Sequence, residues 1–398
     1  MNFQNKNTTH FFSSVTEVPQ TIWDSLECTN NLYFHPDYLF SIEKNNPQIT
    51  FFYIVLTDKH KKAIALASLQ LIEVPLNSIE DSLNKNKVFH KLKCFGRKLG
   101  VFPELKPIKV LVCGNTFVSG EHGIFIQKHL NKQLILKKIA KAMLLLVNSD
   151  TSLNKEISIF LMKDFIKESR IITDELLDLN YYSFNVEPNM VLKMNPEWQT
   201  FHDYLNALKT KFRVKAKRAL NLSSDLHIEK VTAENSKKHL PEITRLYKKV
   251  ASNANFNLGN FNLQSYVSLL EKFPKKYFLH LYLYDKKVVG FLSGMINETS
   301  LDAHFVGIDY QKNKLLAIYQ RMLYDYINIA IERQLKVINF GRTASEIKSS
   351  IGAVPEHLTC YLRHKKSLTN KFLKPFLKHI EPTPFQQKFP FKLEKKQE

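Results

Sequence analysis

The segment Tyr277–Asn297, YFLHLYLYDKKVVGFLSGMIN, decides the fold because it reads as two strands joined by a tight turn. Aromatic and β-branched residues fill both runs, and the polar group Asp285–Lys287 separates them, which is typical of a hairpin. A third strand-like segment follows at Leu301–Asp309, LDAHFVGID, and then Leu315–Gln334 shows the three-and-four spacing of an amphipathic helix. The order hairpin, strand, helix predicts an α/β unit with a mixed sheet.

The same order occurs earlier in the chain, which indicates a second unit. Phe51–Val74 reads as a hairpin, Lys109–Val118 as a strand and Gln127–Ser149 as a long helix. We therefore expect two tandem α/β units, each a mixed twisted sheet flanked by helices. Pro188 and Pro196 suggest the boundary between them. The expected domains are 1–190, 191–364 and a basic, aromatic tail at 365–398.

The composition favours a large folded protein with an anionic partner. The chain has 398 residues, 44% of them hydrophobic, and a formal net charge of +20. Its four cysteines are widely spaced, so we expect neither a disulfide framework nor a metal site, and a reducing cytoplasm fits. The N-terminus lacks the pattern of a signal peptide, and the longest apolar run, Ala63–Ile72, is too short to span a bilayer. We expect a cytoplasmic protein, peripheral on the inner membrane face if it binds lipid.

A basic segment lies between the two units. Tyr204–Asn221, YLNALKTKFRVKAKRALN, has the apolar spacing of one helix and carries six cations within Lys209–Arg218. Such a face is either simply exposed to solvent or binds phosphate groups, with Lys211, Lys215 and Arg218 as candidate contacts. No sequence-specific nucleic-acid motif accompanies it, so sequence-specific DNA binding is not expected.

The stretch Val337–Leu358, VINFGRTASEIKSSIGAVPEHL, begins as a buried strand and continues as a polar segment. With the basic segment and the hairpin before it, the run INFGRTASEIKSSIGA resembles the Fem-type and CelD-like branch of the GNAT acyltransferase superfamily. The resemblance covers Gln199–His364 and extends to the first unit by architecture. It implies tandem GNAT-like units, an enzyme, and transfer of an acyl or aminoacyl group to an amine.

One segment departs from the usual GNAT pattern. A glycine-rich turn normally brings backbone amides to the pyrophosphate of coenzyme A at a helix N-terminus. The corresponding segment here, Asp309–Ala317, has no glycine and offers Gln311, Lys312 and Lys314 instead. The donor could therefore be acyl-CoA, an acyl carrier protein thioester or an aminoacyl-tRNA, and no metal is expected.

The resemblance and the residue chemistry together give candidate catalytic groups. The resemblance implies that Lys348 contacts the transferred carbonyl, with Gly341 and Arg342 at the strand end and Glu346 orienting the lysine. Strand alternation places Asp302 and His304 on one face, and an imidazole with an ordinary pKa of about 6.5 can accept a proton from the amine. The alternatives are surface ion pairs for the first group and a structural histidine for the second.

The tail combines cations with aromatic rings, including Phe385, Phe389 and Phe391. This mixture is typical of an interfacial membrane anchor, although an ordinary packed extension is equally compatible. We expect a direct N-acyltransferase that uses a thioester donor and an amine acceptor, with an amino lipid as one candidate. The alternatives are an aminoacyl-tRNA-dependent cell-wall (peptidoglycan) aminoacyltransferase and a non-catalytic polyanion-binding protein on the same scaffold.

Overall fold

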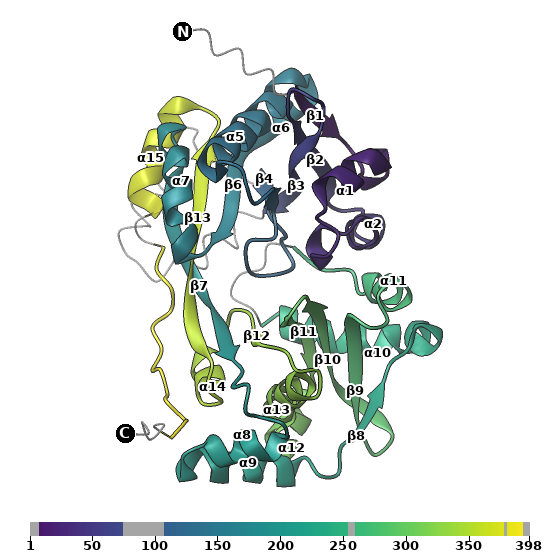
Figure 1. The fold of residues 1–398 in the computed structure, drawn as a ribbon. Helices are drawn as coiled ribbons and strands as arrows, with labels where there is room; N and C mark the ends of the chain where they lie inside the picture. The colour runs from purple at the N-terminus through teal and green to yellow at the C-terminus, as the bar shows by residue number, and fades with distance from the viewer. Residues whose placement is uncertain (1–7, 75–106, 254–258, 378–379, 393–398) are drawn as a thin grey trace. The chain divides into compact units, whose positions relative to one another are not determined.

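The computed structural model describes residues 8–74, 107–253, 259–377 and 380–392. These residues form two compact units (Figure 1). Unit 1 comprises 1–187, 254–261 and 357–382, and unit 2 comprises 188–253, 262–356 and 383–398. The C-terminal part of the chain is therefore divided between the units, which differs from the expected separate tail. Residues 357–364 belong to unit 1 because this segment pairs with the strand Ile157–Phe165 of that unit.

Unit 1 is built on a mixed sheet with the strand order β1-β2-β3-β4-β6-β13. The strands are β1 (Thr8–Phe12), β2 (Thr50–Thr57), β3 (Ala63–Val74), β4 (Ile108–Cys113), β6 (Ile157–Phe165) and β13 (Val354–His364), with β5 (Ile124–Ile126) beside β3. The helices are α1 (Gln20–Leu26), α2 (Pro36–Asn45), α5 (Lys132–Ser149), α6 (Thr151–Glu156), α7 (Arg170–Asp178) and α15 (Ser367–Leu377), with 3-10 turns η1 (Val15–Glu17), η2 (Leu32–Phe34) and η3 (Lys167–Ser169). Only β4 and β6 pair in parallel within this order. The apolar face of α5 packs on the sheet and closes the core of unit 1.

Unit 2 has the strand order β7-β12-β11-β10-β9-β8. Its strands are β7 (Tyr182–Lys193, which begins in unit 1), β8 (His227–Lys230), β9 (Tyr277–Tyr284), β10 (Lys287–Asn297), β11 (Ser300–Ile308) and β12 (Val337–Asn339). Its helices are α8 (Phe201–Ala207), α9 (Thr210–Leu222), α10 (Ala233–Ala251), α11 (Gln264–Lys272), α12 (Tyr310–Leu316), α13 (Ile318–Glu332) and α14 (Ser345–Ser349). Strands β11 and β12 are parallel, and the other pairs are antiparallel.

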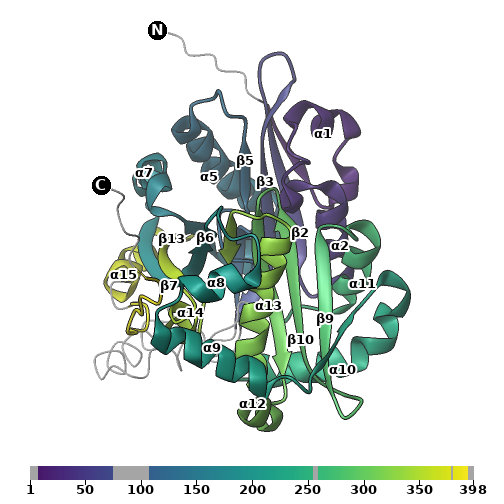
Figure 2. The ribbon, with the colours of Figure 1, turned by 60° about the horizontal axis from the view of Figure 1, so that its bottom comes forward.

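Helices cover both faces of the unit 2 sheet. Helices α8, α9 and α13 lie together on one side, and α10 and α11 lie on the other (Figure 2). On the first side, Met322 of α13 packs over Gly290 of β10, and on the second, Leu246 of α10 packs over Gly307 of β11. The predicted fold class, two α/β units with mixed sheets flanked by helices, is confirmed, and both predicted hairpins are present.

The basic segment Tyr204–Asn221 is two helices rather than the single helix that its spacing predicted. Helix α8 ends at Ala207, and Leu208 has the extended angles φ −72° and ψ 141°. Leu208 pairs there with Phe391 as an isolated β-bridge, and Lys209 N donates to the Pro390 carbonyl at 2.8 Å. A segment distant in sequence thus supplies the hydrogen bonds that a continuous helix would have made.

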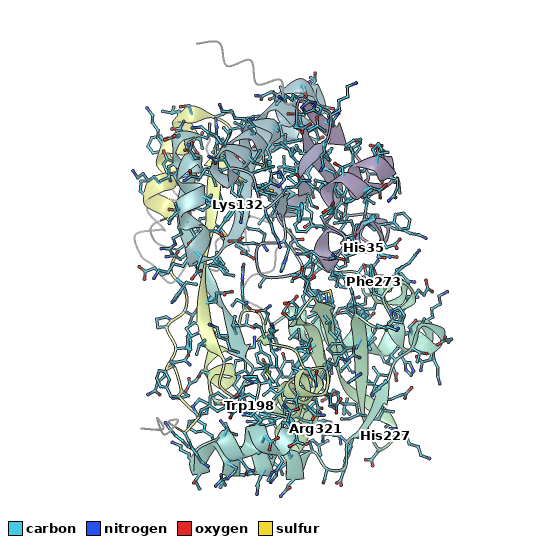
Figure 3. The ribbon with its side chains drawn as sticks, in the orientation of Figure 1. His35, Lys132, Trp198, His227, Phe273 and Arg321 are labelled. Atoms are coloured by element: carbon cyan, nitrogen blue, oxygen red, sulfur yellow. The ribbon has the colours of Figure 1, made fainter. Side chains whose placement is uncertain are left out.

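The segment 383–392 packs back on unit 2. The ring of Phe391 lies 5.4 Å from Trp198, which is labelled in Figure 3, and 6.0 Å from Tyr204. Phe385 also packs against this core, whereas Phe389 is 69% exposed. Of Phe385, Phe389 and Phe391, only Phe389 is exposed, and Phe372, another ring of the basic, aromatic tail, is 51% exposed.

Candidate functional site

The chain turns sharply after β12. Gly341 has φ +72°, and Thr343 and Ala344 also have positive φ, at 66° and 49°. Left-handed backbone at two consecutive residues that carry a Cβ costs about 1–3 kcal/mol each, and such strain often occurs at functional sites. The turn is fixed to β7, because Met190 N donates to the Gly341 carbonyl at 3.1 Å.

Lys348 stabilises this turn through hydrogen bonds to its backbone. Its side chain is buried, with 4% of its surface exposed, and Nζ donates to the carbonyls of Phe340, Gly341 and Arg342 at 2.8, 3.2 and 2.7 Å. Burial lowers the pKa of Lys348 to about 7. The three carbonyl oxygens act in the opposite direction, because only an ammonium group can donate three hydrogen bonds.

This geometry bears on the role expected for Lys348. All three donors point at backbone oxygens, so contact with a substrate oxyanion would require one of these bonds to break. The orienting partner expected for Lys348, Glu346, instead pairs with Lys388 at 3.0 Å. The half-buried side chain of Arg342 begins within the turn that Lys348 stabilises. Lys348 and Arg342 as catalytic groups therefore stay predictions.

A polar network connects the turn to the sheet. Gly341 N donates to Asn189 Oδ1 at 3.0 Å, and Asn189 Nδ2 donates to Asn339 Oδ1 at 3.3 Å. Asn339 Nδ2 in turn donates to Asp302 Oδ1 at 2.5 Å. Asn189 and Asp302 are buried, so these amides place the carboxylate and the turn in a fixed relation. The sequence did not indicate either asparagine.

Strand β11 contains a β-bulge at His304 and Phe305. Leu292 pairs with Val306 and Gly294 pairs with Ala303, so two residues of β11 face the single residue Ser293 of β10. Both bulged side chains turn to the same face of the sheet, which is what an extra residue in a strand produces. His304 lies 5.9 Å from the ring of Tyr266, on α11.

Three hydrogen bonds define the surroundings of His304. The Ser293 hydroxyl donates to the Phe305 carbonyl at 2.8 Å. Tyr266 Oη lies 3.0 Å from Ser293 Oγ and 3.3 Å from His304 Nδ1. Asp302 lies on the same face of the sheet as His304, and this face is called the His304 face below. The hydrogen bond given above for Asp302 runs to Asn339 and not to His304.

The α12 residues expected to bind the donor lie at a helix N-terminus that is already capped. Asp309 Oδ1 accepts from the amides of Gln311 and Lys312 at 3.0 and 3.2 Å. Lys312 Nζ lies over the ring of Tyr284, at 4.8 Å from its centre. A carboxylate in this position both occupies the amides and repels a pyrophosphate group. Gln311, Lys312 and Lys314 could contact a donor only through their side chains.

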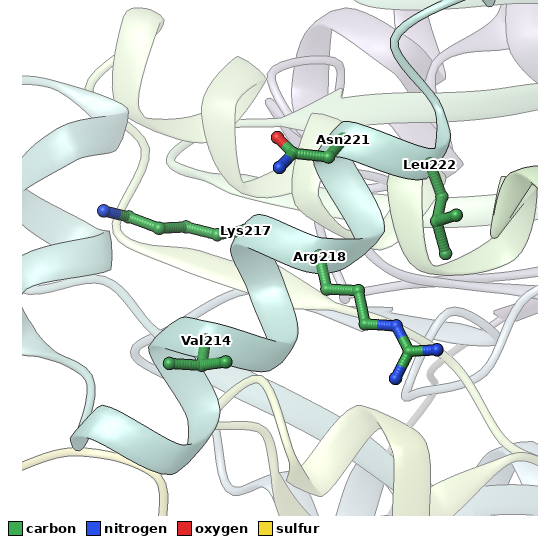
Figure 4. A pocket seen from close by; sticks show the side chains of 5 residues that line it. All are labelled: Val214, Lys217, Arg218, Asn221 and Leu222. Atoms are coloured by element: carbon green, nitrogen blue, oxygen red, sulfur yellow. The ribbon is translucent and has the colours of Figure 1, made fainter.

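The cations of α9 are separate from the His304 face. Ala216 and Ala219 of α9 are buried on the α13 side of the sheet, while Lys211, Lys215 and Arg218 are exposed on the outer side of the helix. Val214, Lys217, Arg218, Asn221 and Leu222 line an open depression of about 430 Å³ there (Figure 4). The structure therefore places His304 and the cations of α9 on opposite sides of the unit 2 sheet.

Unit 1 contains a buried polar cluster that the sequence did not reveal. Lys163 Nζ contacts Asp164 Oδ2 at 2.6 Å and donates to the carbonyls of Asn115 and Val118 at 2.7 and 3.0 Å. Asp164, which has φ +67°, accepts from Gly120 N at 3.2 Å. The cluster fixes the loop after β4, and adjacent Lys and Asp residues in a strand gave no sign of burial.

The described residues contain no group of three or more His, Cys, Asp and Glu side chains arranged to hold a metal ion. Cys28, Cys113 and Cys360 are buried, and Cys94 lies outside the described residues. No helix in the part of the chain that the structure describes is both long and apolar enough to cross a membrane.

Comparisons with known proteins identify the fold. No protein family and no curated protein matches the sequence. Among solved structures, FemX superposes with a TM-score of 0.54 at 12% identity, over 92% of this chain and 100% of that one. L-PGS from Bacillus licheniformis has a TM-score of 0.50 at 11% identity, over 90% and 97% of the two chains.

N-myristoyltransferase of Saccharomyces cerevisiae, solved with bound myristoyl-CoA, has a TM-score of 0.50 at 13% identity, over 89% of this chain and 78% of that one. Identities this low carry information on the fold and not on the reaction. The strand orders and the matches across nearly the whole chain agree with the expected architecture, and the chain has a GNAT-like fold of the Fem type.

Proposed function

We propose that the protein is an N-acyltransferase that moves an acyl group from a thioester donor directly to an amine. The observation that carries the proposal is the β-bulge in β11, which turns His304 to the same face of the sheet as Tyr266. The GNAT-like fold supports the reaction class, because a myristoyl-CoA-bound transferase shares it.

The hydrogen bonds around Tyr266 support one tautomer of His304. Ser293 uses its only hydroxyl proton on the Phe305 carbonyl, so Ser293 Oγ accepts from Tyr266. Tyr266 Oη then accepts from His304, which places the histidine proton on Nδ1. In this tautomer Nε2 carries a lone pair and can receive a proton from the attacking amine.

The proposed reaction proceeds without an acyl-enzyme. The amine nitrogen attacks the thioester carbonyl, its proton passes to His304 Nε2, and the carbon–sulfur bond breaks to release the thiol or thiolate. Arg342 is the candidate for stabilising the carbonyl oxygen as it becomes negative. Lys348 acts in this proposal by holding the turn that carries Arg342, and Asp302 acts by anchoring that turn through the two asparagines.

The donor is acyl-CoA or an acyl carrier protein thioester. Since Asp309 caps α12, coenzyme A would bind without the backbone cradle, through the side chains of Gln311, Lys312 and Lys314. A carrier protein thioester has no pyrophosphate group and does not need the cradle. The acceptor is an amine, and we name an amino lipid as the first candidate, which would place the protein at the inner face of the membrane.

The capped α12 also supports a second candidate. An aminoacyl-tRNA presents an ester in place of a thioester and likewise needs no pyrophosphate site, so the same face could serve a cell-wall aminoacyltransferase. Lys211, Lys215 and Arg218 would then contact the tRNA backbone. A protein that binds polyanions without catalysis is the third candidate, and in that case His304 has no chemical role.

Untargeted mass spectrometry of lipids and cell wall from a deletion strain separates the three candidates. Loss of an N-acylated lipid supports the proposal, loss of a cross-bridge residue supports the tRNA-dependent enzyme, and an unchanged inventory supports the binding protein. Complementation with His304→Gln tests the site, since the proposal expects the missing compound to stay missing. A complementing gene that carries Lys287→Gln, a change at the exposed first residue of β10, is the matched control.

A further inference from the structure

We propose that the outer side of α9, together with α12, docks unit 2 on an anionic phospholipid bilayer. The name "α9–α12 surface" is used below for Val214, Arg218 and Leu222 of α9 and Tyr310 and Leu315 of α12. Figure 1 and Figure 2 place α12 beside the C-terminal part of α9, and the two helices are in contact.

Most of the exposed large apolar side chains of unit 2 that the structure describes belong to α9 and α12. Among the described residues, six large apolar side chains of unit 2 are exposed: Val214, Leu222, Tyr310, Leu315, Val354 and Phe389. Four of the six belong to the α9–α12 surface, and Val214 and Leu315 are 60% and 64% exposed. Large aliphatic groups that project into water are costly unless a partner covers them.

The same side of α9 carries a dense positive charge. At 100° per residue, the seven residues Lys211, Val214, Lys215, Lys217, Arg218, Asn221 and Leu222 fall within an arc of about 160°. Four of them are cations, and α9 contains no acidic residue. None of the ion pairs found among the described residues involves a cation of α9.

A lipid surface satisfies both properties at once. Anionic headgroups match the cations, and the acyl boundary accepts aliphatic side chains that project between them. A nucleic acid would use the cations and the ring of Tyr310, but not Val214, Leu222 and Leu315, which cannot stack on bases as aromatic rings do. The helix is held firmly at its C-terminal end, where Arg321 (Figure 3) donates to the Ser223 carbonyl at 3.3 Å and pairs with Asp325 at 2.9 Å.

The inference can be tested without the proposed transfer reaction, although α12 also carries the candidate donor side chains Gln311, Lys312 and Lys314. The α9–α12 surface lies on the α13 side of the sheet, whereas His304 faces α11 on the other side. Vesicle binding requires no donor, no acceptor and no turnover. A vesicle-binding experiment can therefore support or refute the docking surface whatever reaction occurs on the His304 face.

The test is flotation of the full chain with vesicles of phosphatidylcholine alone or mixed with phosphatidylglycerol. The aliphatic variant combines Val214→Ser, Leu222→Ser and Leu315→Ser, and its matched control combines Ile171→Ser, Leu177→Ser and Leu368→Ser at exposed positions of unit 1. The cation variant combines Lys211→Gln, Lys215→Gln and Arg218→Gln, with Lys59→Gln, Lys62→Gln and Lys141→Gln as control. Binding to unfractionated tRNA is measured for every variant.

We expect binding to the mixed vesicles only. The cation variant should weaken it on the order of 100-fold, at roughly fivefold for each lost charge. The aliphatic variant should weaken it at least tenfold with its tRNA binding unchanged, and both controls should bind like the wild type. Absence of binding to the mixed vesicles would overturn the inference. Unchanged vesicle binding by the aliphatic variant would also overturn it, as would tight, salt-sensitive tRNA binding that only the cation variant loses.

Discussion

Lys348 should make the stability of unit 2 depend on pH in a way that one substitution removes. Its side chain is buried, and burial lowers its pKa from 10.5 to about 7. In the unfolded chain the amine keeps its ordinary pKa. Between pH 7 and pH 10.5 the unfolded state therefore binds the proton and the folded state has released it, so the free energy of unfolding rises with pH.

The size of the effect follows from the shift. Each pH unit within this window adds about 1.4 kcal/mol to the free energy of unfolding, and the whole shift corresponds to about 5 kcal/mol. Below pH 7 both states are protonated, and the slope from this group disappears. Lys348→Met removes the titrating group and leaves three carbonyls without their donor, so it changes both the slope and the absolute stability.

Urea unfolding at pH 6, 7, 8 and 9 measures the slope. The chain has two tryptophans, so a Trp23→Phe background leaves Trp198 as the fluorescent reporter of unit 2. We expect the difference in unfolding free energy, wild type minus Lys348→Met, to rise by about 2 kcal/mol in total from pH 7 to pH 9, with the slope approaching about 1.4 kcal/mol per unit, and to be nearly flat below pH 7. Lys287→Met, at an exposed lysine, should show no such slope. A pH-independent difference for Lys348→Met would refute the reasoning and show that the three carbonyls keep the ammonium form.

Three further predictions concern the supports of the proposed site. Phe391→Ser should destabilise unit 2 by about 3 kcal/mol, measured by urea unfolding, because the ring packs on Trp198 and Tyr204; Phe389→Ser, at an exposed ring, should change it little. Asp309→Asn should tighten coenzyme A binding in calorimetry if α12 contacts the donor, since it removes a carboxylate from the helix amides, and unchanged or absent binding would exclude that position. Gly341→Ala should cost about 1 kcal/mol, because φ is +72° but no atom lies within 4 Å of the added carbon; a loss above 3 kcal/mol would contradict this reading.

The sequence predicted those features that depend on local pattern. Two hairpins around polar turns and the apolar faces of α5 and α13 follow from alternation and helical spacing, and they are present. The break at Leu208 was not predictable in this way, because Phe391 and Pro390 supply its partners from far along the chain.

The candidate site was predicted less completely for the same physical reason. His304 was identified as a chemical group, but the bulge that turns it depends on pairing with Ser293 in another strand. The burial of Lys348 was concealed by its polar neighbours, since a short helix in a strained turn has no apolar period to read. Asn189 and Asn339 gain their roles only when β7 and β12 pair.

The measurement that most directly tests the central claim is product formation on the His304 face. Purified protein is incubated with a mixture of lipid and small amines and, in separate reactions, with isotope-labelled acyl-CoA, acyl carrier protein thioester or aminoacyl-tRNA. Mass spectrometry then detects labelled amides. We predict a labelled amide from a thioester donor, a rate that rises with pH in the wild type, and loss of that pH dependence with at least a hundredfold lower rate in folded His304→Gln. Labelled amide formed by His304→Gln at the wild-type rate and with the wild-type pH profile would contradict the account.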